Sequence, residues 1–315
     1  MRIVIRQKDD AQGAGAVGLA LSGGTLKAGA HIGVLHALEE LGVEPTHIAG
    51  TSAGALIAAL YAHGYSVGDM EGLVHSFPGP RLLDAGRPGA ALLFGWLARR
   101  LTNRTHAAQP AMPLGVIAGR RLLAYFEALL ADRQAVRTFS AVATDLYSGR
   151  AIVYSNDPAV AHLPDVLPIH DIARIILGSC ALPGILSPVP CGTHLLVDGA
   201  LRSYAPINIL RQAGCTRIIV VHLNKLRSEW RPRSPFHVAD RALDILLEET
   251  VENELPGDDV MILAPELDDV TWLSFDRLSA CVEEGYACAR ANSDAIRRFL
   301  RTPRKAPGTA RQRKS

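Results

Sequence analysis

The sequence predicts an α/β fold, a three-layer sandwich in which helices cover both faces of a mostly parallel central sheet. Strand patterns and helix patterns alternate along most of the 315 residues,. Several strand patterns, such as 17–21, are continuous apolar runs, and 217–223 is strongly apolar, which is typical of parallel strands buried on both faces,. No internal repeat or linker interrupts the chain before residue 300. We therefore expect one domain over residues 15–300 and a disordered basic tail over 301–315,.

Two strand–turn–helix units come first. In the first unit, an apolar strand pattern is followed by a glycine-rich turn and by a helix pattern with apolar residues at helical spacing, which Gly42 ends,. In the second unit, a short strand pattern leads through a turn of small residues into a helix pattern that is apolar on most sides, so we expect this helix to be buried. The expected elements are a strand at 17–21, a helix at 29–41, a strand at 47–49 and a helix at 55–61.

A less regular stretch, 65–118, follows and is interrupted by five prolines,. Within it, Ala90 to Leu101 combines an apolar face with Arg99 and Arg100, so a helix here either packs as a cap on its own domain or docks on a lipid surface. Beyond this stretch, apolar runs and helical periodicities alternate between Gly and Pro breakers. The elements expected there are helices at 121–131, 169–181, 207–213, 239–254 and 275–300, and strands at 139–146, 151–154, 195–197, 217–223 and 259–263.

Composition and charge argue against several classes of function. The formal net charge is +2, so we do not expect the protein to bind nucleic acid,. The five cysteines are spread out without a C-x-x-C pair, and the chain has neither H-E-x-x-H nor an acidic calcium loop, so no disulfide framework, metal site or cofactor is expected,. No signal peptide and no apolar run long enough to span a membrane is visible, which predicts a cytoplasmic protein with at most transient, peripheral membrane contact.

The turn Gly50-Thr51-Ser52-Ala53-Gly54 has the G-x-S-x-G form of a nucleophile elbow,. Such a turn holds a serine at the tip of a strand with its hydroxyl exposed, and the two glycines let strand and helix approach closely. A small-residue turn before a buried helix explains the pentapeptide alone equally well, but the strand before it and the helix after it fit the elbow. Ser52 is therefore the candidate nucleophile, and the N–H of Ala53 is a candidate oxyanion donor.

The turn Ser22-Gly23-Gly24-Thr25 is a second candidate source of oxyanion donors. A glycine-rich turn between a strand and a helix can point successive N–H groups into one concavity. A phosphate-binding turn or a purely structural turn is the alternative. The sequence lacks the G-K-[ST] of a Walker A loop and the full G-x-G-x-x-G of a dinucleotide site.

A serine hydroxyl needs a base that removes its proton. His170 and His194 lie in the half of the chain where a hydrolase triad places its histidine,. Asp198 ends an apolar strand and precedes Gly199 and Ala200, and the carboxyl ends of strands are where sites form in parallel sheets. An ordinary Asp-Gly turn is the alternative for Asp198. Local sequence alone does not choose among these residues.

Taken together, these blocks resemble the patatin-like phospholipases. The signature of that family is a G-G-G-x-[RK]-G loop, a G-x-S-x-G elbow some two dozen residues later, and a D-G-[GA] tripeptide well downstream. The resemblance extends over residues 15–295, with the blocks in order and at compatible spacing. The matching blocks are Leu21–Ala28, Gly50–Gly54 and Asp198–Ala200, with further blocks at 143–149, 180–188 and 285–286.

The resemblance implies a Ser–Asp dyad without histidine, in which Ser52 is the nucleophile and Asp198 accepts its proton. It also implies an oxyanion hole formed by the backbone of Gly23, Gly24 and Thr25. The implied activity is that of a lipid acyl hydrolase, a serine esterase of the phospholipase A, lysophospholipase or carboxylesterase type that works through an acyl-enzyme. The implied partner is a lipid or phospholipid acyl ester.

The sequence departs from the family pattern at several positions. Lys27 matches the basic position of the loop, but Thr25 stands where the third glycine is usual and Ala28 where the last one is. If position 25 requires a positive φ, a β-branched residue there is unfavourable. The Asn-x-Pro that often follows the aspartate reads 204–206, Tyr-Ala-Pro, in this chain. Two alternatives on the same fold stay open: an acyltransferase with the same dyad and, because of the altered loop, a non-catalytic lipid-binding protein.

Overall fold

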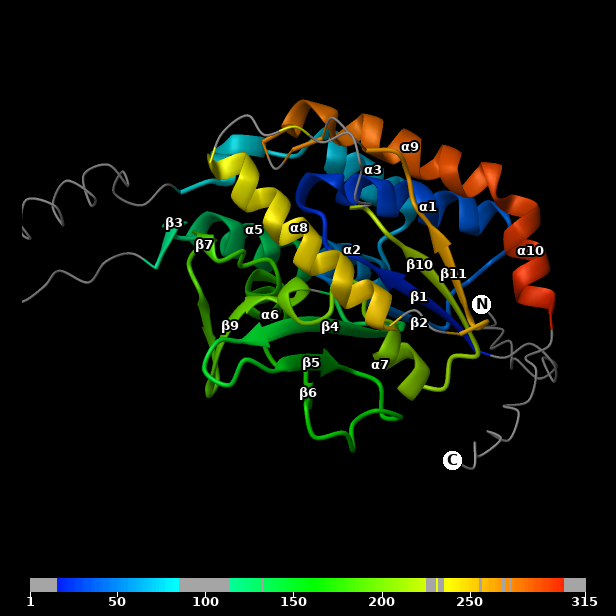
Figure 1. The fold of residues 1–315 in the computed structure, drawn as a ribbon, viewed down its shortest axis with the longest axis horizontal. Coiled ribbons are helices and arrows are strands. Elements are labelled where there is room, and N and C mark those ends of the chain that lie inside the picture. The colour runs from blue at the N-terminus through cyan, green and yellow to red at the C-terminus, as the bar shows by residue number, and fades with distance from the viewer. Residues whose placement is uncertain are drawn as a thin grey trace, which may run out of the picture.

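A nine-stranded sheet lies between helices that cover both of its faces (Figure 1). The computed structural model describes residues 16–84, 114–131, 133–224, 231, 235–254, 257–267, 270–271 and 273–302. The strands of the sheet are β1 (Val17–Leu21), β2 (His47–Thr51), β4 (Thr138–Asp145), β5 (Ala151–Ser155), β6 (Val166–Pro168), β8 (Val189–Cys191), β9 (His194–Asp198), β10 (Arg217–Val221) and β11 (Val260–Leu263). This is the three-layer α/β sandwich that the alternation of strands and helices predicted.

The sheet is mostly parallel, as the apolar strand runs predicted. In the order β11-β10-β1-β2-β4 every neighbouring pair is parallel. β5 then pairs antiparallel with β4, and β6 pairs parallel with β5. β9 lies antiparallel on β4, and β8 on β9, whereas β3 (Gly115–Ile117) and β7 (Gly184–Leu186) form a separate parallel pair. The carboxyl ends of five parallel strands therefore meet at one edge, where sites form in such sheets.

Two groups of helices enclose the sheet. The α-helices are α1 (Gly29–Glu40), α2 (Ala53–Ala62), α3 (Val67–His75), α5 (Arg120–Leu130), α6 (Ile172–Ser179), α7 (Ile207–Gln212), α8 (Pro235–Glu254), α9 (Leu278–Ala291) and α10 (Ser293–Arg301). Short 3₁₀ turns are η1 (Thr25–Ala28), η2 (Gly79–Leu82), η3 (Gly199–Leu201) and η4 (Phe275–Arg277). α1, α2, α3 and α9 contribute to the core on one face, and α7 and α8 to the core on the other.

Successive side chains of the central strands enter these two cores alternately. Leu19 and Leu21 of β1 belong to the core under α1 and α2, whereas Ala20 belongs to the core under α7 and α8. In β10, Ile219 lies in the first core and Ile218 in the second. Because adjacent side chains of a strand point to opposite faces, a strand covered on both sides must be apolar throughout. This requirement explains the unbroken apolar runs in the sequence.

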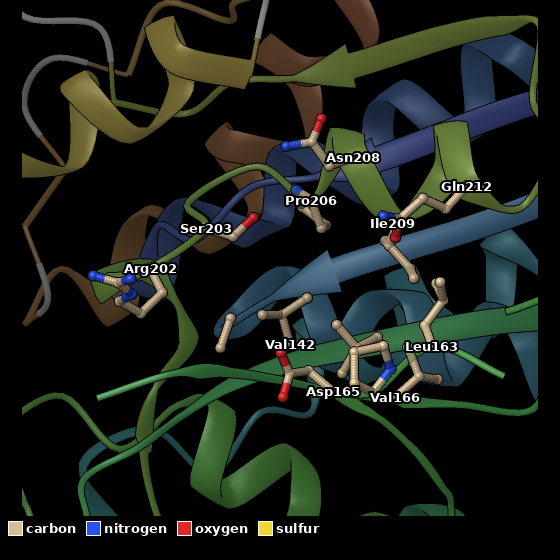
Figure 2. Close-up of a pocket in the computed structure, with 13 residues that line it drawn as sticks. Val142, Leu163, Asp165, Val166, Arg202, Ser203, Pro206, Asn208, Ile209 and Gln212 are labelled. Carbon is tan, nitrogen blue, oxygen red and sulfur yellow. The ribbon is translucent and has the colours of Figure 1, made fainter. Parts of the chain in front are cut away.

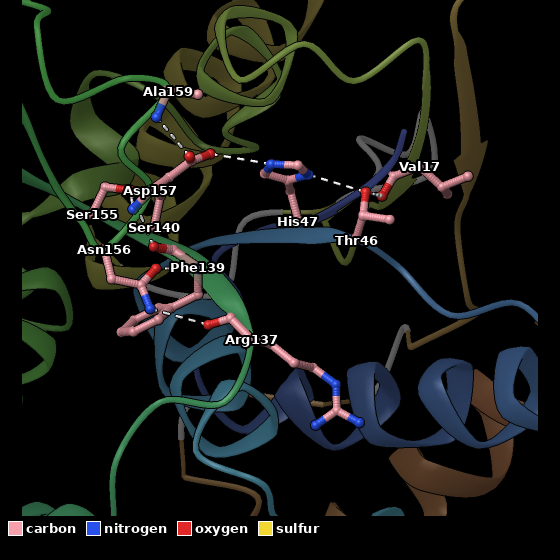
Figure 3. A network of polar contacts seen from close by, with 10 residues as sticks. All are labelled: Val17, Thr46, His47, Arg137, Phe139, Ser140, Ser155, Asn156, Asp157 and Ala159. Carbon is pink, nitrogen blue, oxygen red and sulfur yellow. Dashed lines mark hydrogen bonds and ion pairs between the residues drawn. The ribbon is translucent and has the colours of Figure 1, made fainter. Parts of the chain in front are cut away.

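A polar network ties β1, β2 and the loop after β5 together at the amino end of β2 (Figure 3). His47 Nε2 lies 3.2 Å from Asp157 Oδ2, and the other carboxylate oxygen of Asp157 accepts the N–H of Ala159 at 2.8 Å. The hydroxyl of Thr46 donates to the carbonyl of Val17 at 3.0 Å. The register of these strands is thus fixed at the edge of the sheet that lies away from the carboxyl ends.

The parts of the stretch 65–118 that the structure describes, 65–84 and 114–118, include regular elements that the prolines did not suggest. They contain α3, whose first turn is closed by a capping box between Ser66 and Asp69,. Only Val67 and Met70 of this short helix are buried, which explains why its apolar periodicity was too weak to predict it. The expected helix at Ala90 to Leu101 lies outside the described residues.

The end of the chain also differs from the expectation. The single helix expected over 275–300 is divided into η4, α9 and α10, with the break at Asn292. The side-chain amide of Asn292 donates to the Cys288 carbonyl at 2.8 Å, and this bond helps to end α9. Residues 303–315, which include most of the expected basic tail, lie outside the described residues.

Candidate active site

Ser52 lies at the turn between β2 and α2 with φ 55° and ψ −129°. Among the described residues, the only other non-glycine residue with a positive φ is Thr25. Such backbone strain is worth about 1–3 kcal/mol and concentrates at functional sites. A Cβ at Gly50 would lie 2.3 Å from the Gly54 carbonyl oxygen, and one at Gly54 would lie 2.4 Å from that of Leu21. Both glycines are therefore needed for β1, β2 and α2 to approach closely enough to form this elbow.

The register of the sheet brings the end of β9 to the end of β2. Within β4, Val142 pairs with Thr51 of β2, and the next residue, Ala143, pairs with Asp198 of β9. β5 occupies the other edge of β4. β2 and β9 therefore share one edge and meet head to head, which places Ser52 beside Asp198 although 146 residues separate them in the sequence.

Ser52 and Asp198 form a buried hydrogen bond. The Ser52 hydroxyl donates to Oδ2 of Asp198 at 2.8 Å, and the N–H of Ala200 donates to Oδ1 at 2.9 Å. Burial raises the pKa of Asp198 to about 6, although the hydrogen bonds from Ala200 and Ser52 lower it. A carboxylate with this pKa is ionised at neutral pH and still basic enough to accept a proton.

The backbone around Asp198 is fixed on both sides. The hydroxyl of Thr144 donates to the Asp198 carbonyl at 2.9 Å, and the Asp198 N–H donates to the carbonyl of Ala181 at 2.9 Å. A Cβ at Gly199 would lie 2.1 Å from the carbonyl oxygen of Val142. The glycine after the aspartate is thus required by this close approach, so the Asp-Gly pair is more than a surface turn.

The two candidate histidines lie toward the other end of β9. His194 begins this strand, and a rise of about 3.4 Å per residue puts it about 14 Å from Asp198,. His170 is exposed and contacts Cys191, the residue that pairs with His194. The Ser52 hydroxyl instead donates to the carboxylate of Asp198. The sequence alone did not choose among the three candidate bases. Their distances from Ser52 favour Asp198.

The glycine-rich turn lies beside the candidate nucleophile, since a Cβ at Gly23 would be 3.5 Å from the Cβ of Ser52. The N–H of Gly23, however, donates to the carbonyl oxygen of Tyr204 at 3.1 Å. Gly23 was expected to supply an oxyanion donor, but its N–H is already engaged. The sequence had no signal for this, because the acceptor is a backbone carbonyl far along the chain.

Three other N–H groups remain as candidate oxyanion donors. Within the described part of the chain, no group accepts from the N–H of Gly24, Thr25 or Ala53. Each belongs to the start of η1 or α2, where the first N–H groups of a helix have no partner inside the helix. The positive end of the α2 dipole adds to the attraction for a negative charge at this place.

The glycine-rich loop departs from the family pattern at Thr25 and Ala28, and the two positions differ in the backbone conformation that they require. Thr25 has φ 50°, unfavourable for a β-branched residue, and its exposed hydroxyl donates to the Gly24 carbonyl at 2.8 Å,. Ala28 has φ −57° and ψ −17°, an ordinary helical conformation, so no glycine is needed there. The ammonium of Lys27 donates to the side-chain oxygen of Asn224 at 2.5 Å. The loop thus keeps its N–H groups, with strain confined to Thr25.

An apolar cavity of about 110 Å³ adjoins the candidate donors. Thr25 and Ala53 belong to its wall, together with side chains from α1, α2, α3 and α5. On α2 the lining residues Ala53, Leu56 and Leu60 follow at helical spacing along two turns, a length of about 10 Å,. The cavity therefore offers an apolar chain a path that begins beside Ser52.

A larger cavity of about 280 Å³ lies between β4, β5 and α7 (Figure 2). Its wall combines polar side chains, such as Arg202, Asp165 and Asn208, with apolar ones. Neither Ser52 nor Asp198 lines it, so it is separate from the candidate site.

The described residues contain no cluster of three or more His, Cys, Asp or Glu side chains arranged to hold a metal ion. None of the helices that the structure describes is long and apolar enough to cross a membrane.

Sequence reasoning missed two side chains that contact Ser52. The N–H of Ser52 donates to Oγ of Ser179 at 2.8 Å, and that hydroxyl donates to the carbonyl of Val142 at 2.5 Å. The thiol of Cys180 also contacts Ser52, and burial raises the pKa of this thiol. The available signal is the block at 180–184 that matches the resemblance, since it contains Cys180 and directly follows Ser179.

Comparisons with known proteins identify a family to which the chain is similar. A family model described as patatin-like phospholipase matches residues 19–211. Uncharacterized protein YqhO of Bacillus subtilis is 30% identical over 241 residues, which cover 72% of this chain and 77% of that protein.

Two further similarities are more distant. An uncharacterized NTE family protein of Mycobacterium tuberculosis is 24% identical over 306 residues, 88% of this chain but 46% of that protein. The chain thus spans less than half the length of this relative. The crystal structure of VipD from Legionella pneumophila superposes with a TM-score of 0.48 at 16% identity, covering 90% of this chain and 67% of that one.

Proposed function

Because this chain belongs to the patatin-like phospholipase family, we propose that it hydrolyses carboxylic ester bonds of lipids through an acyl-enzyme on Ser52. The observation that carries the proposal is the buried 2.8 Å hydrogen bond from the Ser52 hydroxyl to Asp198, at a strained elbow. A serine with an adjacent base is the usual arrangement for nucleophilic acyl transfer. Asp198 takes the role of that base directly, without a histidine.

In the first half of the reaction, Ser52 Oγ attacks the ester carbonyl carbon while its proton passes to Asp198. The carbonyl oxygen becomes an oxyanion, which the N–H groups of Gly24, Thr25 and Ala53 are placed to stabilise. Collapse of the tetrahedral intermediate breaks the bond to the alcohol oxygen. The proton on Asp198 moves to this leaving oxygen, so the acyl-enzyme forms and Asp198 is again ionised.

In the second half, water replaces the alcohol. Asp198 accepts a proton from the water molecule as its oxygen attacks the acyl carbon, and a second oxyanion forms. Collapse releases the carboxylic acid, and the proton returns from Asp198 to Ser52 Oγ. Atoms balance as ester plus water giving alcohol plus acid.

The apolar cavity supports a lipid acyl chain as the substrate group. Its wall is almost entirely hydrophobic, and it begins at Thr25 and Ala53, where the carbonyl carbon must lie to meet the oxyanion donors. Each methylene that moves from water into such a cavity contributes about 0.8 kcal/mol. An ester with a longer acyl chain should therefore bind more tightly, up to the length that the cavity accommodates.

Replacing Leu56 with tryptophan tests this placement of the acyl chain. Leu56 lines the cavity one helical turn beyond Ala53 and is only partly buried, so a larger side chain can enter the cavity while the helix is kept. We expect kcat/KM for a dodecanoyl p-nitrophenyl ester to fall at least about tenfold, because the chain loses apolar contact. Activity on the acetyl ester should change less than about twofold. An equal loss on both esters would place the acyl chain elsewhere.

A further inference from the structure

The peptide unit between Gly23 and Gly24 carries one of the candidate oxyanion donors. A trans peptide is planar, and its C=O and N–H point in opposite directions. No peptide bond among the described residues is cis. The direction of the Gly24 N–H is therefore set by whatever holds the Gly23 carbonyl.

Two buried hydroxyls hold that carbonyl. The phenol of Tyr204 donates to the Gly23 carbonyl oxygen at 2.7 Å, and the hydroxyl of Ser22 donates to the same oxygen at 2.9 Å. The Gly23 N–H donates back to the Tyr204 carbonyl at 3.1 Å. The Tyr204 ring also packs on Gly23, since a Cβ there would lie 3.1 Å from a ring carbon. Tyr204 thus contacts Gly23 at its N–H, its carbonyl and its Cα.

Tyr204 is itself fixed from the opposite side. Its N–H donates to the hydroxyl of Thr250 in α8 at 3.2 Å, and its ring meets the ring of His222 edge-on at 5.4 Å. The N–H of Leu223 donates to the Ser22 hydroxyl at 3.1 Å, which fixes the second donor. Burial raises the pKa of the Tyr204 phenol, so it remains protonated and able to donate.

We propose that Tyr204, together with Ser22, is a positioning residue that orients the Gly24 N–H toward the oxyanion formed at Ser52. By fixing the Gly23 carbonyl on one side of the peptide, the two hydroxyls fix the Gly24 N–H on the other side, beside the nucleophile. Tyr204 occupies the position where the Asn-x-Pro motif has its asparagine, so the phenol that holds the Gly23 carbonyl stands where this chain departs from that motif. The inference rests on the proposed function, because it concerns the oxyanion of that reaction.

Orienting a donor in advance is worth most in the transition state, where the oxygen carries its charge. Loss of the Tyr204 hydroxyl should therefore lower kcat and leave KM unchanged. A merely structural role would reduce thermal stability without this selective effect. The two hydroxyls share one acceptor, so removing either leaves the other in place, and removing both should lower kcat by more than the product of the two single effects.

The test compares Tyr204→Phe, Ser22→Ala and the double variant on a soluble p-nitrophenyl butyrate. Tyr154→Phe is the matched control, because Tyr154 in β5 is equally buried and far from Gly23 in the sheet order. We expect Tyr204→Phe to lower kcat about tenfold with KM changed less than twofold, and Tyr154→Phe to change neither. The affinity of an alkyl trifluoromethyl ketone, whose serine adduct carries an oxyanion, should fall by the same factor as kcat.

Unchanged kcat and unchanged ketone affinity in folded Tyr204→Phe would overturn the inference and leave the proposed function intact. If Tyr204→Phe does not fold, the same two quantities are measured in Ser22→Ala. A lower kcat and a lower affinity for the ketone would support the inference, and no change in either would overturn it. Absence of ester turnover in the wild-type protein would overturn the proposed function and this inference with it.

Discussion

Replacing Ser52 with alanine is expected to lower kcat for ester hydrolysis by at least about 10⁴-fold while the protein stays folded. Ser52 supplies the oxygen that forms the acyl-enzyme, and alanine has none. Alanine also keeps the Cβ of serine, so the strained turn at φ 55° has to accommodate nothing new. Initial rates on p-nitrophenyl butyrate, together with the thermal unfolding midpoint, measure both parts of this expectation.

Ser140→Ala provides the matched control. Ser140 in β4 is buried to a similar degree as Ser52 and donates to the hydroxyl of Ser155, so its replacement removes one buried hydroxyl elsewhere in the sheet. Its kcat should stay within about twofold of the wild type. If Ser52→Ala kept more than about a tenth of the wild-type rate, another residue would have to be the nucleophile.

Asp198→Asn is expected to reduce kcat about 10³- to 10⁴-fold. The amide has the shape of the carboxylate, and its oxygen can still accept from the Ala200 N–H while its NH2 group faces the Ser52 oxygen, but it cannot take the proton,. The wild-type kcat/KM should rise with pH and reach half of its maximum near pH 6, since burial raises the pKa of Asp198 to about 6 and only the ionised form accepts a proton,. A pH profile measured between pH 4.5 and 8.5 tests this. A rate independent of pH across that range would contradict Asp198 as the base.

The same carboxylate should lower the stability of the protein at neutral pH. Its pKa in the folded state is about 6, above the ordinary value of 3.8 for an aspartate side chain. A group with a raised folded pKa stabilises the fold below its unfolded pKa, and this contribution is lost as the pH rises through 6, by up to about 3 kcal/mol. Asp198→Asn should therefore unfold at a higher temperature than the wild type at pH 8, and the difference should shrink toward pH 4. The same difference at both pH values would contradict the raised pKa.

The elements around the candidate nucleophile were predictable from sequence because most of their residues are buried. β1 has the predicted bounds, 17–21, since both of its faces enter a core and every residue is apolar. The elbow was recognisable because two close backbone contacts require Gly50 and Gly54, and because the strand before it and the helix after it have clear patterns. Requirements of this kind restrict which residue types can occupy a position, so they can be recognised in the local sequence.

The identity of the base, in contrast, could not be recognised in the local sequence. Asp198 meets Ser52 only because β2 and β9 end on the same edge of β4, a pairing between segments far apart in the chain. The neighbourhoods of His170 and His194 gave no reason to place them elsewhere. Only the resemblance to a family selected the aspartate, through a tripeptide whose glycine is required by the carbonyl of Val142.

The sequence indicated which turn could supply oxyanion donors, but not which of its N–H groups have no other acceptor. The turn 22–25 was the expected source, yet the N–H of Gly23 bonds to Tyr204, 181 residues away. Thr25 shows that a non-glycine residue can occupy the strained position of the loop, with its hydroxyl on the preceding carbonyl. Which N–H groups remain free depends on these tertiary contacts, and no local pattern encodes them.

Labelling with an alkyl fluorophosphonate, followed by peptide mass mapping, tests the central claim most directly. The reagent phosphonylates a serine only where a base activates the hydroxyl and the N–H groups of the oxyanion hole donate to the phosphonyl oxygen. We expect one adduct, on the peptide that contains Ser52, and none in Ser52→Ala or, over the same time, in Asp198→Asn. A folded wild-type protein that formed no adduct, or an adduct on another residue, would contradict the assignment of Ser52 as an activated nucleophile.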